Sequence, residues 1–156
     1  MFPANFIVAT RVDCECTASS KKRVLERVGE LLATAAPNLL PEEVFEQLLE
    51  RERLGSTGLG HGIALPHARL KGITQACGAL VRLESGVDYD AIDGQPVDLV
   101  FGLLVPHDAT QEHLQLLAKL AALFSKEEFR NQLRKAEDCE AIMALMQQAD
   151  AYQESA

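Results

Sequence analysis

The sequence predicts a single α/β domain built as a three-layer sandwich, with a mixed β-sheet between flanking helices. Apolar residues recur at helical spacing near both ends of the chain, while the middle holds short runs rich in apolar and β-branched residues. The chain has 156 residues, the length of one domain, and no repeat, low-complexity tract or linker divides it. We therefore expect one domain over residues 1–156.

Two helices are predicted in the first third of the chain. The first covers about 20–35, behind the capping candidates Ser19 and Ser20. The second covers 41–53, because Pro41 suits the first position of a helix. The residues expected to face the core share helical spacing: Val24, Leu25, Val28, Leu31, Leu32, Val44, Leu48 and Leu49.

A glycine-rich loop and a short strand are predicted over 54–68. The loop glycines are expected to adopt positive φ and to bring backbone N–H groups close to an anion. Residues 63–65 indicate a buried strand, and Pro66 is expected to end it, which places His67 on the rim of a loop. The glycines concerned are Gly55, Gly58, Gly60 and Gly62.

The second half of the chain is predicted to complete the sheet and then to become helical. Apolar runs within 76–105 indicate strands, with Asp93-Gly94 as a turn signal between them. Helices follow over 109–148, and Asp108 is the expected cap of the first. One face of that helix is expected to contain Leu114, Leu117, Ala121 and Phe124.

The charge of the chain excludes several classes of partner. Fifteen basic and twenty-three acidic residues give a net charge of −8, which disfavours nucleic acid and anionic membranes and favours a partner with a basic docking face. No apolar run approaches the roughly 18 residues of a membrane helix, so membrane insertion is not expected. The amino terminus lacks the features of a secretory signal, so we expect a cytoplasmic protein.

The four cysteines do not form a metal-binding pattern. Cys14 and Cys16 make one close pair, but Cys77 and Cys139 do not complete a zinc ligand set. We expect free thiols and no bound metal.

Two of the four histidines are candidates for phosphoryl transfer. His67 follows a proline at a strand end, and His113 falls near a helix amino terminus, where the dipole and free N–H groups favour a phosphate. A neutral imidazole can accept a phosphoryl group, and a second imidazole at the same sheet edge can hold its oxygens. We therefore expect His67 to be the nucleophile and His113 to stabilise the group. This chemistry needs no cofactor.

Several neighbouring groups could contact the phosphoryl oxygens. Candidate donors are the hydroxyls of Ser56 and Thr57 and the backbone N–H groups of the loop, including the N–H of Gly58. Either Arg51 or Arg53 could add positive charge.

Long motifs in this chain resemble the type-2 IIA domains of the bacterial phosphoenolpyruvate-dependent phosphotransferase system, abbreviated PTS EIIA. The motifs are RERLGSTG at 51–58, GIALPHA at 62–68, DAIDGQPVDL at 90–99 and LLVP at 103–106. With the Ser-Lys-Lys-Arg run at 20–23, the resemblance covers nearly the whole chain and is strongest to the nitrogen-regulatory members of the family. It implies the mannitol-IIA-like fold.

The resemblance also implies roles for particular residues. His67 matches the phosphorylated histidine of the family, which accepts its phosphoryl group from an HPr-like carrier protein. His113 matches the second active-site histidine, and Arg51 matches the arginine before the glycine loop. Nitrogen-regulatory members act through their phosphorylation state, and targets in relatives include potassium-transport proteins and sensor kinases.

Two other functions are compatible with the sequence. A sugar-specific IIA component of the fructose or mannitol kind has nearly the same motif and passes phosphate to a IIB domain. A metal-binding module built from histidines is the other alternative, because His61 and His67, and again His107 and His113, lie six residues apart.

Overall fold

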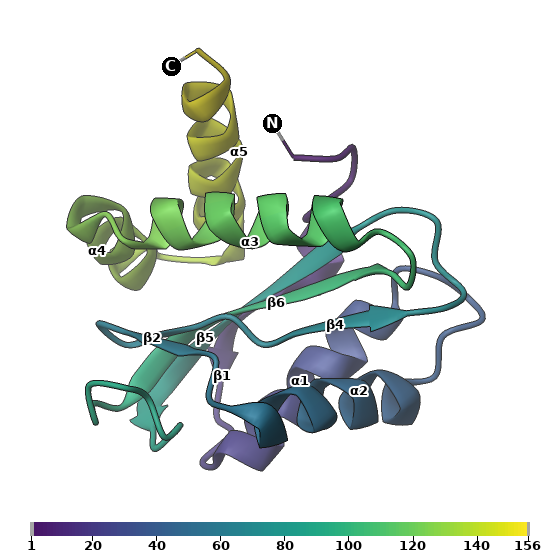
Figure 1. Cartoon of the computed structure of the whole chain (residues 1–156). Helices are drawn as coiled ribbons and strands as arrows, with labels where there is room; N and C mark the ends of the chain where they lie inside the picture. Colours follow the sequence, from purple (N-terminus) through teal and green to yellow (C-terminus); the bar gives the residue numbers. More distant parts are fainter. Residues whose placement is uncertain (1, 156) are drawn as a thin grey trace.

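The computed structural model describes residues 2–155, with side chains up to residue 149. A mixed sheet lies between two layers of helix, as predicted (Figure 1). In chain order the elements are η1 (Ala9–Arg11), β1 (Val12–Cys16), α1 (Lys21–Ala33), α2 (Pro41–Leu54), β2 (Gly58–Gly60), β3 (Ile63–Ala64), β4 (His67–Leu70), β5 (Cys77–Val87), β6 (Val97–Pro106), α3 (Thr110–Phe124), α4 (Glu127–Lys135) and α5 (Cys139–Ser155).

The strands follow the order β1-β5-β6-β3-β2, and β4 also pairs with β6. The pairs β1/β5, β3/β6 and β4/β6 are parallel, while β5/β6 and β2/β3 are antiparallel. Helices α1 and α2 cover one face, and α3, α4 and α5 lie on the other (Figure 1). Alternate residues of β5 serve the two cores: Ala79 and Val81 pack under α1 and α2, whereas Leu80 packs on the α3 side.

The predicted helices at 20–35 and 41–53 correspond to α1 and α2. Ser20 is the N-cap of α1, because its Oγ accepts a hydrogen bond from the N–H of Arg23 at 3.2 Å. Val44 and Leu48 are fully buried, and Leu49 packs at the edge of the same core.

The strand that carries His67 differs from the prediction. Residues 63–65 do not form one strand ending at a loop; β3 covers two residues, Pro66 interrupts it, and β4 begins at His67 itself. Both pieces run parallel to β6, and the Pro66 carbonyl still accepts a hydrogen bond from Leu103 at 2.9 Å. The proline removes one donor but leaves the chain in register, so His67 is held by the sheet.

Several predicted boundaries were wrong. Strand β1 was not predicted, and the N-cap of α3 is Ala109, without a side-chain cap, instead of Asp108. Leu114 is 65% exposed, since the buried face of α3 is formed by Leu116, Leu120, Leu123 and Phe124. The last helix, α5, is longer than expected because it includes both Cys139 and the residues to Ser155.

The prediction of four free thiols was also wrong. Cys14 of β1 and Cys139 at the start of α5 form a disulfide across 125 residues, with their Cα atoms 5.5 Å apart. Cys16 and Cys77 are free and buried. The spacing of the cysteines in the sequence does not predict this disulfide, because the disulfide depends on α5 packing beside β1. Among the described residues no helix has the length and apolar character needed to cross a membrane.

Candidate active site

His67 is held with one ring nitrogen bonded to the backbone and the other facing an arginine. Its Nδ1 lies 2.8 Å from the carbonyl oxygen of Leu65, and its Nε2 lies 3.2 Å from Nε of Arg51. Burial is the main cause that lowers the pKa of His67, and the charge of Arg51 lowers it further. A neutral imidazole in this setting carries its proton on Nδ1, donates it to Leu65, and keeps the lone pair on Nε2.

Arg51 lies in the last turn of α2 and joins the imidazole to the glycine loop. Its Nε donates to Nε2 of His67, and its Nη1 donates to the carbonyl oxygen of Gly55 at 2.9 Å. No acidic side chain within the described part of the chain forms an ion pair with Arg51. Its charge is therefore available to an anion at Nε2.

His113 lies in the first turn of α3 and faces His67. The two rings are edge to face, with centroids 5.1 Å apart. Burial, followed by the charges of His67, Arg69 and Arg51, lowers the pKa of His113 to about 4, so the ring is neutral at pH 7. Its Nε2 is buried and has no hydrogen-bond partner among the described residues. Buried polar atoms are rarely left unpaired, so this atom is a candidate hydrogen-bonding group for a phosphoryl oxygen.

The hydroxyls predicted to bind phosphate form hydrogen bonds within the loop and with its neighbours. Ser56 Oγ donates to the carbonyl oxygen of Tyr89 and accepts from the N–H of Gly58 at 3.1 Å. Thr57 Oγ1 is buried against the carboxylate of Glu52. Arg53 is exposed and pairs with Glu50. The structure thus brings His67, His113 and Arg51 together, and uses the two hydroxyls to shape the loop beside them.

The loop glycines do not all have the role that the sequence predicted. Gly60 and Gly62 have φ of +93° and +80°, on either side of His61 at the tip of the β2–β3 hairpin. Gly58 has no positive φ; a Cβ there would lie 2.8 Å from Cβ of Ala91. Gly58 is therefore needed for close packing.

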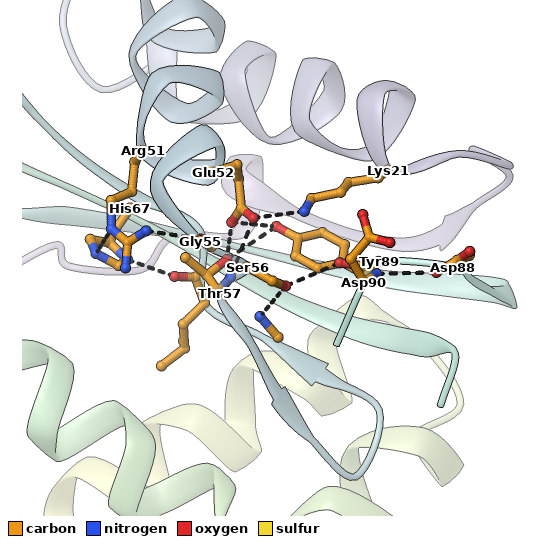
Figure 2. A network of polar contacts seen from close by, with 12 residues as sticks. Lys21, Arg51, Glu52, Gly55, Ser56, Thr57, His67, Asp88, Tyr89 and Asp90 are labelled. Carbon is orange, nitrogen blue, oxygen red and sulfur yellow. Dashed lines mark hydrogen bonds and ion pairs between the residues drawn. The ribbon is translucent and has the colours of Figure 1, made fainter. Parts of the chain in front are cut away.

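Sequence reasoning missed the carboxylate of Glu52, next to Arg51 on α2. Figure 2 shows this side chain meeting Lys21, Thr57 and Tyr89. It lies 2.9 Å from Nζ of Lys21, accepts the N–H of Thr57 at 3.2 Å, and accepts the hydroxyl of Tyr89 at 3.1 Å. Burial and this carboxylate raise the pKa of Tyr89. An acidic residue in an amphipathic helix is usually solvated, so the pattern contained no signal for it.

Four exposed apolar side chains come from the elements that carry the site. One ends α2, one lies in β2, one lies in the loop that packs on β2, and one follows His113. They are Leu54, Leu59, Ile92 and Leu114. We call this set the apolar rim. Exposed apolar side chains beside a site are candidates for a protein-docking surface.

The alternative of a histidine metal site has no cluster to support it. Among the side chains described, those of residues 2–149, no three His, Cys, Asp or Glu are grouped so that they could hold a metal ion. His61 is exposed at the hairpin tip, where its backbone N–H donates to Asp93, and His107 is exposed before α3.

Comparison with known proteins identifies the family. The family described as phosphoenolpyruvate-dependent sugar phosphotransferase system, EIIA 2, matches residues 5–149. The nitrogen regulatory protein of Pseudomonas aeruginosa is 48% identical over 127 residues, covering 81% of this chain and 82% of that protein. The crystal structure of the nitrogen regulatory protein IIA-Ntr from Neisseria meningitidis has a TM-score of 0.85 and 44% identity, covering 90% of this chain and 95% of that one.

A sugar-specific relative is less similar. The fructose-specific EIIABC component of Bacillus subtilis is 36% identical over 133 residues, covering 85% of this chain but only 21% of that protein. The family match and the two nitrogen regulatory relatives agree with the motifs around His67. This chain belongs to the EIIA 2 family of the phosphoenolpyruvate-dependent sugar phosphotransferase system.

Proposed function

We propose that this chain is a phosphocarrier that accepts a phosphoryl group on Nε2 of His67 and regulates partner proteins through its phosphorylation state. The observation that carries the proposal is the pairing of two neutral imidazoles, one buried and one half-buried, with one arginine that has no carboxylate partner among the described residues. That set supplies a nucleophile, a donor and a positive charge at one point, which is what phosphoryl transfer needs.

The transfer exchanges one P–N bond for another. The lone pair of His67 Nε2 attacks the phosphorus of a phosphohistidine on the donor protein, and the electron pair of the broken P–N bond returns to the donor's ring nitrogen. Each ring keeps the proton on its other nitrogen, so the donor imidazole leaves neutral. On His67 that proton stays on Nδ1, bonded to the carbonyl oxygen of Leu65.

His113 and Arg51 would hold the phosphoryl oxygens. The unpaired Nε2 of His113 can carry a proton and donate it in a hydrogen bond to one oxygen. Arg51 already touches Nε2 of His67, so its guanidinium can transfer that hydrogen bond to an oxygen as the new bond forms. Both groups act most strongly when charge builds up on the equatorial oxygens.

The donor is expected to be an HPr-like carrier protein that docks on the apolar rim. The net charge of −8 favours a donor with a basic face. After transfer, the phosphoryl group places two negative charges inside this docking surface, which weakens binding of an apolar or acidic partner. This gives the two forms different partners; potassium-transport proteins and sensor kinases are candidate targets.

Intact-protein mass spectrometry tests the proposal. The protein is incubated with phosphoenolpyruvate, the general phosphotransferase and an HPr-like carrier, beside His67→Ala and the control His107→Ala, which changes an exposed histidine. We expect an acid-labile gain of one phosphoryl group in the wild type and in the control, and none in His67→Ala. Labelling that survives in His67→Ala would reject the assignment. Rapid onward transfer to a IIB domain would instead favour the sugar-specific alternative.

A further inference from the structure

The carboxylate of Glu52 is fully bonded but takes no part in the proposed transfer. Its side chain is 2% exposed. Oε1 accepts the hydroxyls of Thr57 and Tyr89, and Oε2 accepts the N–H of Thr57 and binds Nζ of Lys21. Four donors fill the usual acceptor capacity of a carboxylate, so the group has one position and one orientation (Figure 2).

A continuous series of hydrogen bonds leads from Glu52 to the imidazole of His67. The N–H of Thr57 donates to Glu52 at 3.2 Å, and the carbonyl oxygen of Thr57 accepts the N–H of Leu65 at 3.0 Å. The carbonyl oxygen of Leu65 then accepts Nδ1–H of His67 at 2.8 Å. Because Thr57 and Leu65 each use both backbone polar groups in this series, the position of Thr57 sets the place of the acceptor that selects the His67 tautomer.

The same carboxylate anchors the other side of the imidazole. Arg51, its neighbour in the last turn of α2, donates to Nε2 of His67 and to the carbonyl oxygen of Gly55. Glu52 ties that turn to the loop through Thr57. Both contacts of the imidazole therefore depend on one buried acidic residue.

Lys21 makes this arrangement compatible with an incoming phosphoryl group. It is the first residue of α1, its Nζ lies 2.9 Å from Glu52, and it lies 4.5 Å from the centroid of the Tyr89 ring. An uncompensated buried carboxylate would repel the phosphoryl oxygens and would be costly to bury. Lys21 compensates the charge of the Glu52 carboxylate. It does so without bonding to His67, because it belongs to α1.

We propose that Glu52, neutralised by Lys21, is a positioning residue for His67: through Thr57 and Leu65 it selects the Nδ1–H tautomer that leaves Nε2 free to attack. The effect on transfer rate rests on the proposed phosphocarrier function, whereas the effect on the tautomer does not. Two measurements therefore test the effect on the tautomer and the effect on the transfer rate separately.

The first measurement is the ¹⁵N spectrum of the His67 side chain in the unphosphorylated protein. The wild type is expected to show a protonated Nδ1 and a bare Nε2. Glu52→Gln is expected to show a mixture of tautomers, and Thr57→Val, which keeps the backbone N–H, a smaller change. Glu50→Gln is the matched control, because Glu50 lies on the same helix but is exposed. A pure Nδ1–H tautomer in Glu52→Gln overturns the proposal.

The second measurement is the rate of phosphorylation by the HPr-like carrier. Glu52→Gln is expected to lower kcat by about 10- to 100-fold with little change in KM, because the apolar rim is untouched. Lys21→Met is expected to be slower still, since it leaves the carboxylate uncompensated, while Lys22→Met serves as its exposed control. The double variant Lys21→Met/Glu52→Gln should recover to the level of Glu52→Gln, because no buried charge is then left alone.

The two measurements together test both the charge compensation by Lys21 and the positioning of His67 by Glu52. An additive loss in the double variant overturns the charge-compensation step, because two residues in direct contact that compensate each other's charge are not additive. If the wild type is never phosphorylated on His67, the proposed function fails, and the tautomer spectrum still decides whether Glu52 positions the ring. If Glu52→Gln does not fold, Glu52→Asp tests the series, because it keeps the charge and withdraws the carboxylate from the N–H of Thr57; a pure Nδ1–H tautomer in that variant overturns the proposal.

Discussion

The imidazole rings of His67 and His113 lie edge to face with their centroids 5.1 Å apart, and Nε2 of His113 is buried without a partner among the described residues. Two neutral rings at this distance leave a donor available beside the nucleophile. The ring pair joins β4 to the first turn of α3, and the two histidines are 46 residues apart in the sequence.

We predict that His113→Ala slows phosphoryl transfer more than it affects folding. Removing a donor aimed at the developing charge costs about 100-fold in rate in comparable sites. The substitution also deletes an unpaired buried polar atom, so the stability loss should be small. Stopped-flow transfer and urea unfolding on the same preparation check this; a large loss of stability with unchanged transfer would contradict it.

The lowered histidine pKa values predict a pH dependence of stability. In the folded protein His113 resists protonation until about pH 4, while in the unfolded chain it takes up a proton near pH 6.5. The unfolded state therefore binds more protons in this window, and the free energy of unfolding falls as the pH drops from 6.5 to 4. Urea titrations of the wild type and of His113→Gln should diverge in this window, with the shallower slope in the variant. Parallel curves would contradict the low pKa.

Arg51→Lys is expected to slow transfer by about 10-fold or more, because an ammonium cannot contact Nε2 of His67 and the carbonyl oxygen of Gly55 with the same fork of donors. Arg53→Lys is the matched control, since Arg53 is two residues away, exposed, and paired with Glu50. Equal rates in the two variants would remove Arg51 from the site.

Gly62→Ala should destabilise the protein more than Gly94→Ala. Both glycines have positive φ, +80° and +71°, so both variants incur the cost of a left-handed backbone, about 1 kcal/mol. Only at Gly62 would the added Cβ meet other atoms: it would lie 2.7 Å from Oδ1 of Asp98 and closer still to Nη2 of Arg134. At Gly94 no atom of the described residues lies within 4 Å of the added Cβ. The difference between the two urea midpoints measures the crowding at the hairpin, and equal midpoints would show that it relaxes freely.

Reduction of the Cys14–Cys139 disulfide is expected to lower the stability by about 3–5 kcal/mol, because the bond closes a loop of 125 residues. Thermal unfolding with and without a thiol reductant checks this. The variant Cys14→Ser should start at the lower melting temperature and should not respond to reductant. A response in that variant would show that the reductant acts elsewhere.

Local patterns predicted the helices well because they depend on neighbouring residues. Ser20 caps α1 three residues before its bonding partner, and the apolar spacing of α2 marks Val44 and Leu48 as core. The prediction for Leu114 was wrong because periodicity alone does not say which stripe of α3 meets the sheet. The prediction that Asp108 caps α3 was also wrong, because the turn after β6 places Ala109 at the N-cap position.

By itself the sequence determined the layered α/β class, and its motifs around His67 indicated the family and proposed His67, His113 and Arg51 for the site. Only the tertiary structure decided that Thr57 faces Glu52, that Tyr89 completes that network from 37 residues away, and that Cys14 bonds to Cys139. The physical reason is the sequence distance over which each interaction acts. Helix caps and periodicity depend on residues a few positions apart, whereas a buried carboxylate and a disulfide form their contacts only when distant elements pack together.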